Sequence, residues 1–292
     1  MFRQLSMREC GTRVSAVAGK GALLLGLLVG LTQSAARADL SDYSAYAIFG
    51  DYSVSVGNNV TVSRDNSVSA GTYATVSGGF VGSNGTVTFG DYANVTQGVN
   101  APISVTFGAS PVSTGTVYTG GSFTIAGVSP DPVPSGSFVT VKPLTPVTFT
   151  PGDDVFGGDD NSLVVGQGDH YYGYFIVGDR FNLTLDPNGG KIRMFFGGDV
   201  IFGNNLKVTL SSGSAEDIYA QTDASWTFGD NSNWFGTIYA PNDTGYISAG
   251  SGFTMTGALY GSDVSLGTIP APGALVLGAM GIGMVGWLRR RV

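Results

Sequence analysis

Phe235-Gly236-Thr237-Ile238-Tyr239 and, 21 residues further along the chain, Thr256-Gly257-Ala258-Leu259-Tyr260 share one pattern. Both stretches place glycine before a small residue and an aliphatic residue before tyrosine. The pairs Phe228-Gly229 and Ala249-Gly250 upstream of them keep the same spacing. A fixed offset of this length is typical of one coil of a β-solenoid, whose parallel strands stack about 4.8 Å apart. These stretches therefore predict a solenoid.

Less regular copies of a related pattern occur earlier in the chain. An apolar residue, a glycine, a polar corner and a residue pair ending in valine or a similar residue recur at 56–62, 70–76, 89–95 and 202–208. Short alternations of valine, threonine and aromatic residues, separated by Gly, Asn and Asp, are typical of strands and turns. We therefore expect an all-β body built as a parallel β-helix or solenoid, with a two-sheet β-sandwich as the alternative.

The stretch Gly236-Thr237-Ile238-Tyr239-Ala240-Pro241-Asn242 resembles a coil found in solenoid modules of several bacterial surface and pilus-associated proteins. In those modules a second coil of the type Gly257-Ala258-Leu259-Tyr260-Gly261 follows. The resemblance covers residues 190–268. It implies a solenoid fold and a surface setting, and it implies no reaction.

The last residues of the chain form a three-part segment. Ile269-Pro270-Ala271-Pro272 is followed by the uncharged stretch 273–288 and then by Arg289-Arg290-Arg291-Val292. As a helix the uncharged stretch would be about 24 Å long, close to the length that crosses a bilayer. Arginines that directly follow a span favour the cytoplasmic side. The pattern predicts a minimal transmembrane helix with the body outside.

This three-part arrangement resembles the PEP-CTERM sorting signal of Gram-negative bacteria. The resemblance implies recognition and cleavage by an exosortase, a membrane-bound processing protease, in cells that build exopolysaccharide and biofilm matrix. Ala271 stands where the family usually carries glutamate. The alternatives are a tail anchor that stays in the membrane and a hydrophobic core element of the body. The residues assigned to the sorting motif are Pro270, Ala271, Pro272, Arg289, Arg290 and Arg291.

The first residues have the organisation of a secretory signal peptide. Four basic residues precede the apolar run 21–31, and the small-residue site Ala36-Arg37-Ala38 follows it. We expect cleavage after Ala38, with a retained signal anchor as the alternative. The sole cysteine, Cys10, would leave with this peptide. The mature protein would then form no disulfide.

The mature body is strongly acidic. The whole chain has 14 Lys+Arg and 21 Asp+Glu, of which five bases and one acid precede Asp39 and three bases lie in the tail. The body therefore keeps six basic and 20 acidic residues, a net charge of −14. Nucleic-acid binding needs clustered Lys and Arg, so this charge argues against it and favours cations or cationic surfaces as partners.

Proline marks a break in the middle of the body. Six of the 12 prolines lie between Pro130 and Pro151, where they would interrupt strand pairing and stiffen the chain as a linker or an edge segment. The expected organisation is a signal peptide (1–38), an N-terminal β-repeat region (39–127), a Pro-rich linker (128–152), a C-terminal β-solenoid region (153–268) and the sorting segment (269–292).

One cluster of acidic residues is a candidate metal site. Carboxylates and an amide on a glycine-rich loop suit calcium, which takes six to eight oxygen ligands. A solvated acidic turn is the alternative. No other cofactor is expected, because one histidine and no cysteine in the body disfavour zinc and haem. The candidate calcium ligands are Asp153, Asp154, Asp159, Asp160 and Asn161.

The only histidine, His170, follows Asp169 at the start of an expected strand. Neighbouring residues of a strand point to opposite faces, so Asp169 would not orient His170 for catalysis. The chain also has no Gly-x-Ser-x-Gly nucleophile elbow. We therefore expect a protein that is not an enzyme.

Together these features predict an exported structural protein of the cell surface or biofilm matrix of a Gram-negative-type bacterium. It would be anchored in the membrane at least transiently and processed by an exosortase-type protease. It would act by self-association or by holding exopolysaccharide. The alternatives are a β-helix carbohydrate-active enzyme and a calcium-dependent adhesin.

Overall fold

The computed structural model describes residues 42–64, 73–142, 144–242 and 245–267, which form strands, turns and two short 3-10 helices. The predicted signal peptide and sorting segment, with Ala36, Ala38, Pro270, Ala271, Pro272 and Arg289 to Arg291, lie outside these ranges. The elements are η1 Tyr43–Ala45, β1 Tyr46–Val56, β2 Thr61–Ser63, β3 Thr75–Ser77, β4 Phe80–Ser83, β5 Thr86–Phe89, β6 Asn94–Val95, β7 Gly98–Ala101, β8 Ser104–Phe107, β9 Thr116–Thr119, β10 Ser122–Ile125, β11 Val155–Gly157, β12 Ser162–Gly166, β13 Gly168–Tyr172, β14 Phe175–Val177, β15 Asn182–Asp186, β16 Ile192–Phe196, β17 Val200–Phe202, β18 Lys207–Leu210, η2 Ala215–Asp217, β19 Ile218–Thr222, β20 Trp226–Phe228, β21 Asn233–Ala240, β22 Tyr246–Ala249 and β23 Thr254–Leu266.

The body is all-β, as predicted, and every strand pairing between the described strands is parallel. This pattern fits stacked solenoid coils, whereas a β-sandwich is built from antiparallel strands. Within the described ranges no helix is long and apolar enough to span a membrane.

The strand register confirms the repeat found in the sequence. β21 lies on β23 with Gly236 opposite Gly257 and Tyr239 opposite Tyr260. In the first half, Val62 lies opposite Val76 and Val76 opposite Val95. The coils differ in length, however: equivalent residues are 18 apart at Thr106 and Thr124, 21 at Thr227 and Ser248, and 26 at Asn204 and Asp230. Most coils therefore escape a search for one fixed period.

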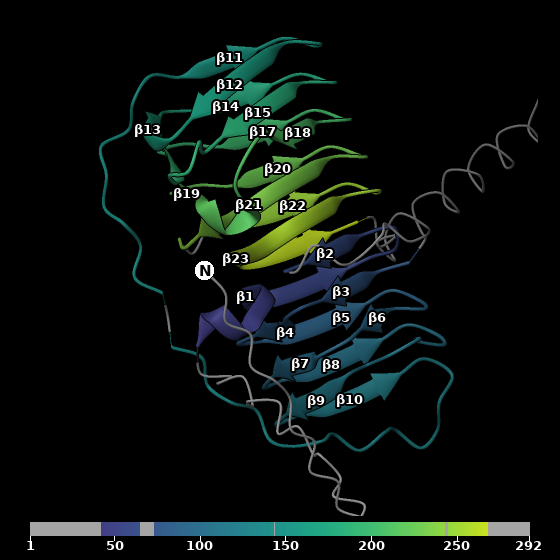
Figure 1. Ribbon diagram of the computed structural model, residues 1–292. Coiled ribbons are helices and arrows are strands. Elements are labelled where there is room, and N and C mark those ends of the chain that lie inside the picture. The colour runs from purple at the N-terminus through teal and green to yellow at the C-terminus, as the bar shows by residue number, and fades with distance from the viewer. Residues whose placement is uncertain (1–41, 65–72, 143, 243–244, 268–292) are drawn as a thin grey trace, which may run out of the picture. The chain divides into compact units, whose positions relative to one another are not determined.

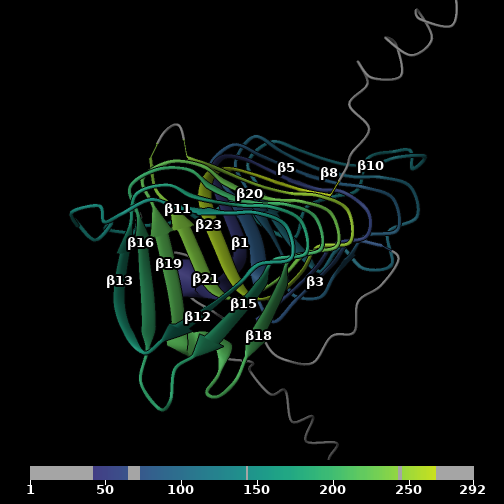
Figure 2. The ribbon, with the colours of Figure 1, turned by 90° about the horizontal axis from the view of Figure 1, so that it is seen from above.

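The chain enters the stack in its middle. β1 pairs with β23 on one side and with β4 and β5 on the other. Strands β2 to β10 continue from β1 toward one end, and β11 to β23 run from the opposite end back to β1 (Figure 1). The coils lie over one another when seen from above (Figure 2). The segment between β10 and β11 therefore carries the chain along the stack.

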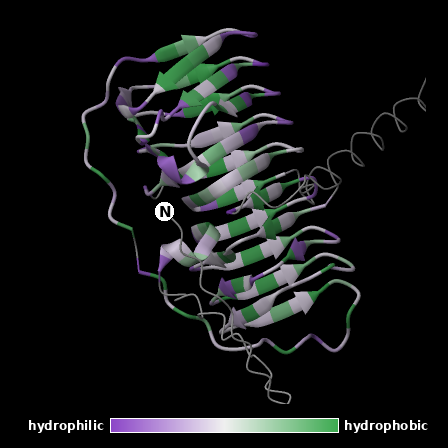
Figure 3. Cartoon of the chain, in the orientation of Figure 1, coloured by the Kyte–Doolittle hydropathy of each residue, from purple (hydrophilic) through white to green (hydrophobic). Residues whose placement is uncertain are grey.

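The core lies inside the coils, where alternate strand residues point. Val54, Val87 and Val105 are fully or almost fully buried and align on β1, β5 and β8. Polar and apolar positions alternate along these strands (Figure 3). Burying one such side chain stabilises the fold by roughly 1.5–3 kcal/mol. On β20 and β21, Trp226 and Trp234 are buried in the interior, with ring centroids 5.2 Å apart.

Gly-Asp and Gly-Asn pairs turn one corner of the coils. The Asp179 carboxylate accepts a hydrogen bond from the Asn204 backbone N–H at 2.7 Å, and Asn204 Oδ1 accepts one from Asp230 N–H at 2.8 Å. A Cβ on Gly203 would lie 2.5 Å from the Asp179 carboxylate oxygen. Glycine is therefore needed at this position, because the side chain of the neighbouring coil occupies the space.

Candidate functional site

A column of outward-facing residues runs the length of the stack on one face. Its members come from nine strands, and each lies opposite the next in the pairing register. From one end of the stack to the other they are Tyr118, Asn100, Gly82, Phe49, Tyr260, Tyr239, Gln221, Phe195 and Tyr171.

The Pro-rich segment predicted as a linker lies along this column. We call residues 135–142 and 144–151 the strap. At one end Gly136 forms a parallel bridge with Tyr118, and at the other the Phe149 ring packs 5.3 Å from the Phe195 ring. Tyr239 donates a hydrogen bond from its hydroxyl to the Leu144 carbonyl at 2.8 Å.

Two buried amide side chains fasten the strap. Asn100 accepts from Val139 N–H at 2.9 Å and donates to the Val139 carbonyl at 2.7 Å. Gln221 accepts from Val147 N–H at 3.0 Å and donates to the Val147 carbonyl at 2.8 Å. Each amide thus satisfies both backbone groups of one strap residue, as a neighbouring strand would. The strap is held without a continuous ladder, which its prolines would interrupt.

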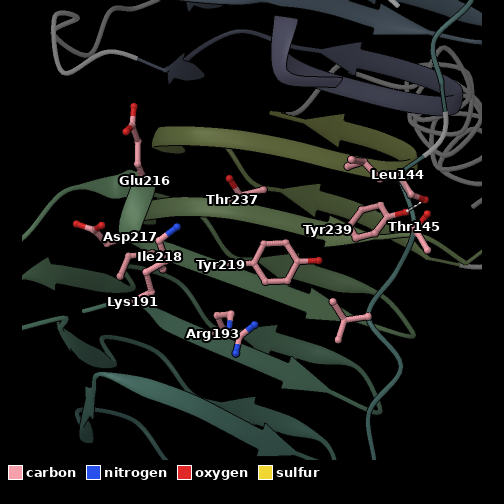
Figure 4. Close-up of a pocket in the computed structure, with 11 residues that line it drawn as sticks. Leu144, Thr145, Lys191, Arg193, Glu216, Asp217, Ile218, Tyr219, Thr237 and Tyr239 are labelled. Carbon is pink, nitrogen blue, oxygen red and sulfur yellow. Dashed lines mark hydrogen bonds between the residues drawn. The ribbon is translucent and has the colours of Figure 1, made fainter. Parts of the chain in front are cut away.

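A groove opens between the strap and the outer face of the coils (Figure 4). Its volume is about 410 Å³. The floor includes Arg193, Tyr219 and Thr237, which lie opposite one another on β16, β19 and β21. The lining residues are Leu144, Thr145, Val147, Lys191, Arg193, Glu216, Asp217, Ile218, Tyr219, Thr237 and Tyr239.

The phenols of the groove are neutral hydrogen-bonding groups. Tyr219 donates from its hydroxyl to Gln221 Oε1 at 2.9 Å, and burial raises its pKa well above the usual value. Burial, with a smaller contribution from Asp51, raises the pKa of Tyr239 to about 12. Both phenols therefore stay protonated at neutral pH and keep their bonds to Gln221 and the strap.

The charged groups of the groove differ in their partners. Arg193 donates two hydrogen bonds to the Asp169 carboxylate, at 2.7 and 2.6 Å. Asp217 accepts hydrogen bonds from the backbone N–H and hydroxyl of Ser214, at 2.8 and 3.2 Å. Lys191 is exposed and has no ion pair among the residues that the structure describes.

The groove combines an aromatic ring, a hydroxyl and charged side chains. Such a mixture of apolar surface and directed polar groups is typical of ligand-binding clefts. A partly exposed tyrosine provides a flat apolar face beside a polar edge. The geometry suits a ligand with alternating apolar and hydroxyl-bearing surfaces.

The candidate calcium ligands lie on both sides of β11. Asp153 and Asp154 precede the strand, and Asp159, Asp160 and Asn161 follow it. Asp154 accepts from Tyr174 N–H at 2.9 Å, while Asp160 accepts two hydrogen bonds from Arg180 at 2.7 Å. Hydrogen bonding to Arg180 lowers the pKa of Asp160. The described part of the chain contains no group of three or more His, Cys, Asp or Glu placed to hold a metal, and calcium binding stays a prediction.

His170 and Asp169 point to different sides of β13. His170 lies opposite the buried Met194, and its Nε2 is 2.8 Å from the Gly166 carbonyl oxygen. Asp169 lies opposite Arg193, with which it forms its ion pair. The two side chains therefore have separate partners.

Sequence reasoning did not identify the groove. Arg193, Tyr219 and Thr237 lie far apart in the chain, and unequal coil lengths hide their alignment. The signal that was available is strand alternation: Tyr219 follows the buried Ile218, and Thr237 precedes the buried Ile238. The sequence could therefore have predicted that the side chains of Tyr219 and Thr237 point away from the core. It could not have predicted that the two residues lie next to each other on neighbouring coils.

The fold and the groove together define a parallel β-solenoid with a strapped outer face. Residues 157–275 match a family model described as "Domain of unknown function (DUF7305)". The matched region contains β12 to β23 and the coil residues that line the groove. No curated protein and no solved structure matched the chain.

Proposed function

We propose that the chain is an exported structural protein of the bacterial surface or biofilm matrix that holds polysaccharide in the groove beside the strap. The signal-peptide pattern ending at Ala38 supports export, and the segment 269–292 supports sorting through a membrane-spanning helix by an exosortase-type protease. The body would project from the cell as a solenoid. Its role would be to bind rather than to catalyse.

The observation that carries this proposal is the direction of the groove floor. Arg193, Tyr219 and Thr237 are aligned across three successive coils, so the floor follows the axis of the stack. Rows spaced about 4.8 Å apart offer repeated contacts to a linear polymer lying along that axis. A sugar ring presents apolar C–H groups to an aromatic face and hydroxyls to its polar neighbours.

The partners of Asp169 and His170 support a binding role. The Asp169 carboxylate is engaged by Arg193, and His170 contacts a backbone carbonyl. A general base must instead be within hydrogen-bond reach of the group that it deprotonates. Exopolysaccharide is the proposed main partner, and self-association through other faces is compatible with it.

Two measurements test the proposal. The full chain, purified in mild detergent, should co-sediment with insoluble exopolysaccharide from the producing cells without shortening the glycan. Mass spectrometry of the C-terminus should find matrix protein that ends near Ile269 or Pro272. Glycan degradation by the purified chain would contradict the structural role. An intact Arg291-Val292 end confined to membranes would contradict sorting into the matrix.

A further inference from the structure

We propose that the groove prefers carboxylate-bearing sugars and that Lys191 is the residue that recognises the carboxylate. This inference rests on the proposed function, since it names the class of glycan that the groove would hold. It depends on the positions of the few basic residues, on the partners of each and on the shape of the floor.

The basic residues of the body are concentrated at this face. Lys191 and Arg193 line the groove, and Arg64 lines a smaller adjoining pocket that shares Glu216 and Thr237 with it. Half of the basic residues in the expected mature body thus line the groove or its adjoining pocket, although the body has a large excess of acidic residues. The six are Arg64, Lys142, Arg180, Lys191, Arg193 and Lys207.

The groove contains two carboxylates, but neither is positioned over Tyr219. Asp217 is bonded to Ser214, and Glu216 extends away from the Tyr219 ring (Figure 4). Arg193 is already neutralised by Asp169, whereas Lys191 has no ion pair within the described ranges. The ammonium group of Lys191 is therefore available to donate hydrogen bonds to an anionic ligand.

The floor fixes how such a ligand would lie. A sugar ring stacked on Tyr219 would have Thr237 on one side and Arg193 on the other, in the order of the strand register. Lys191 lies two residues before Arg193 at the edge of the groove, where it can reach a carboxylate on a sugar ring. The rest of the surface is acidic and would repel a polyanion, which would restrict binding to the groove.

The test compares hexagalacturonate with cellohexaose, a neutral chain of equal length, by calorimetric titration of the full chain in mild detergent. Wild type should bind hexagalacturonate more tightly. Lys191→Met should weaken that binding about tenfold, as loss of a charge-assisted hydrogen bond predicts, and leave cellohexaose binding unchanged. Lys207→Met is the matched control, because it removes the same charge from an exposed residue of β18 outside the groove.

The outcomes separate the inference from the proposed function. The preference for carboxylates would be overturned if wild type bound the two oligosaccharides with equal affinity. It would also be overturned if Lys191→Met and Lys207→Met lost the same affinity for hexagalacturonate. In both cases the proposal of glycan binding would stand. Failure to bind either oligosaccharide while the matrix exopolysaccharide still co-sediments would overturn the inference alone, and loss of that co-sedimentation as well would overturn both. Thermal unfolding of each variant checks that the fold is intact, which the exposure of Lys191 predicts.

Discussion

Gly257→Ala is expected to lower the free energy of unfolding by about 3 kcal/mol or more. Gly257 has a φ of 144°, and a Cβ there would overlap the carbonyl oxygen of Gly236 on the neighbouring coil. That oxygen belongs to the β21–β23 pairing and cannot move away without breaking it. Urea unfolding followed by far-ultraviolet circular dichroism measures the change.

Gly166→Ala is the matched control for this substitution. Gly166 also lies in a strand, β12, but a Cβ there would meet no atom within 4 Å. Its expected effect is within about 0.5 kcal/mol, as for other unstrained surface changes. Equal destabilisation by the two substitutions would contradict the close stacking of Gly236 on Gly257.

Gln221→Ala is expected to release the strap and to destabilise the protein by roughly 1–3 kcal/mol. The substitution leaves both backbone groups of Val147 and the Tyr219 hydroxyl without their partner. Limited chymotrypsin digestion should then cut after Phe149, and mass spectrometry should identify the fragments. The groove should be lost with the strap, because Val147 and Leu144 form one of its walls.

Gln167→Ala serves as the comparison, since Gln167 is exposed and directly precedes β13, four residues before the column residue Tyr171. It should leave both the stability and the digestion pattern unchanged. If Gln221→Ala is digested no faster than Gln167→Ala, the strap is held by other contacts, and the role assigned to the amide is wrong.

The fold could be predicted where the coils have equal length. Gly236 and Gly257 occur at equivalent positions of two coils, and the structure pairs them directly. Alternation of valine, threonine and aromatic residues likewise predicted short strands, and Val87 lies on one of them, opposite Val105 of the next coil. Both signals are local: the alternation depends on the two-residue period of a strand, and the glycine match depends on one repeat between neighbouring coils.

The arrangement of the two halves could not be predicted in the same way. β1 pairs with β23, yet Ile48 and Leu259 are separated by almost the whole body. The described residues between β10 and β11 form no strand, and proline disfavours strand pairing. The position of the Pro-rich segment on the outer face depends on Asn100 and Gln221, two isolated amides that no sequence pattern singles out.

The candidate calcium loop shows a different limit. Its composition predicted oxygen ligands, but its acids also have structural partners at the coil corners. Asp159 accepts from Asp179 N–H at 2.9 Å, and Asp160 is paired with Arg180. Asp residues at solenoid corners can therefore be explained by hydrogen bonds between coils as well as by a metal.

The central claim is that the groove beside the strap holds polysaccharide on the ring of Tyr219. The most direct measurement is the affinity of the full chain for the matrix glycan in wild type, Tyr219→Phe and Tyr219→Leu. The ring-preserving Phe variant should bind with almost the wild-type affinity. The affinity of the Leu variant should fall about tenfold, since aromatic-ring contacts contribute roughly 0.5–1.5 kcal/mol beyond the area that they bury. Equal affinity of the Leu and Phe variants, with both folded, would contradict the account.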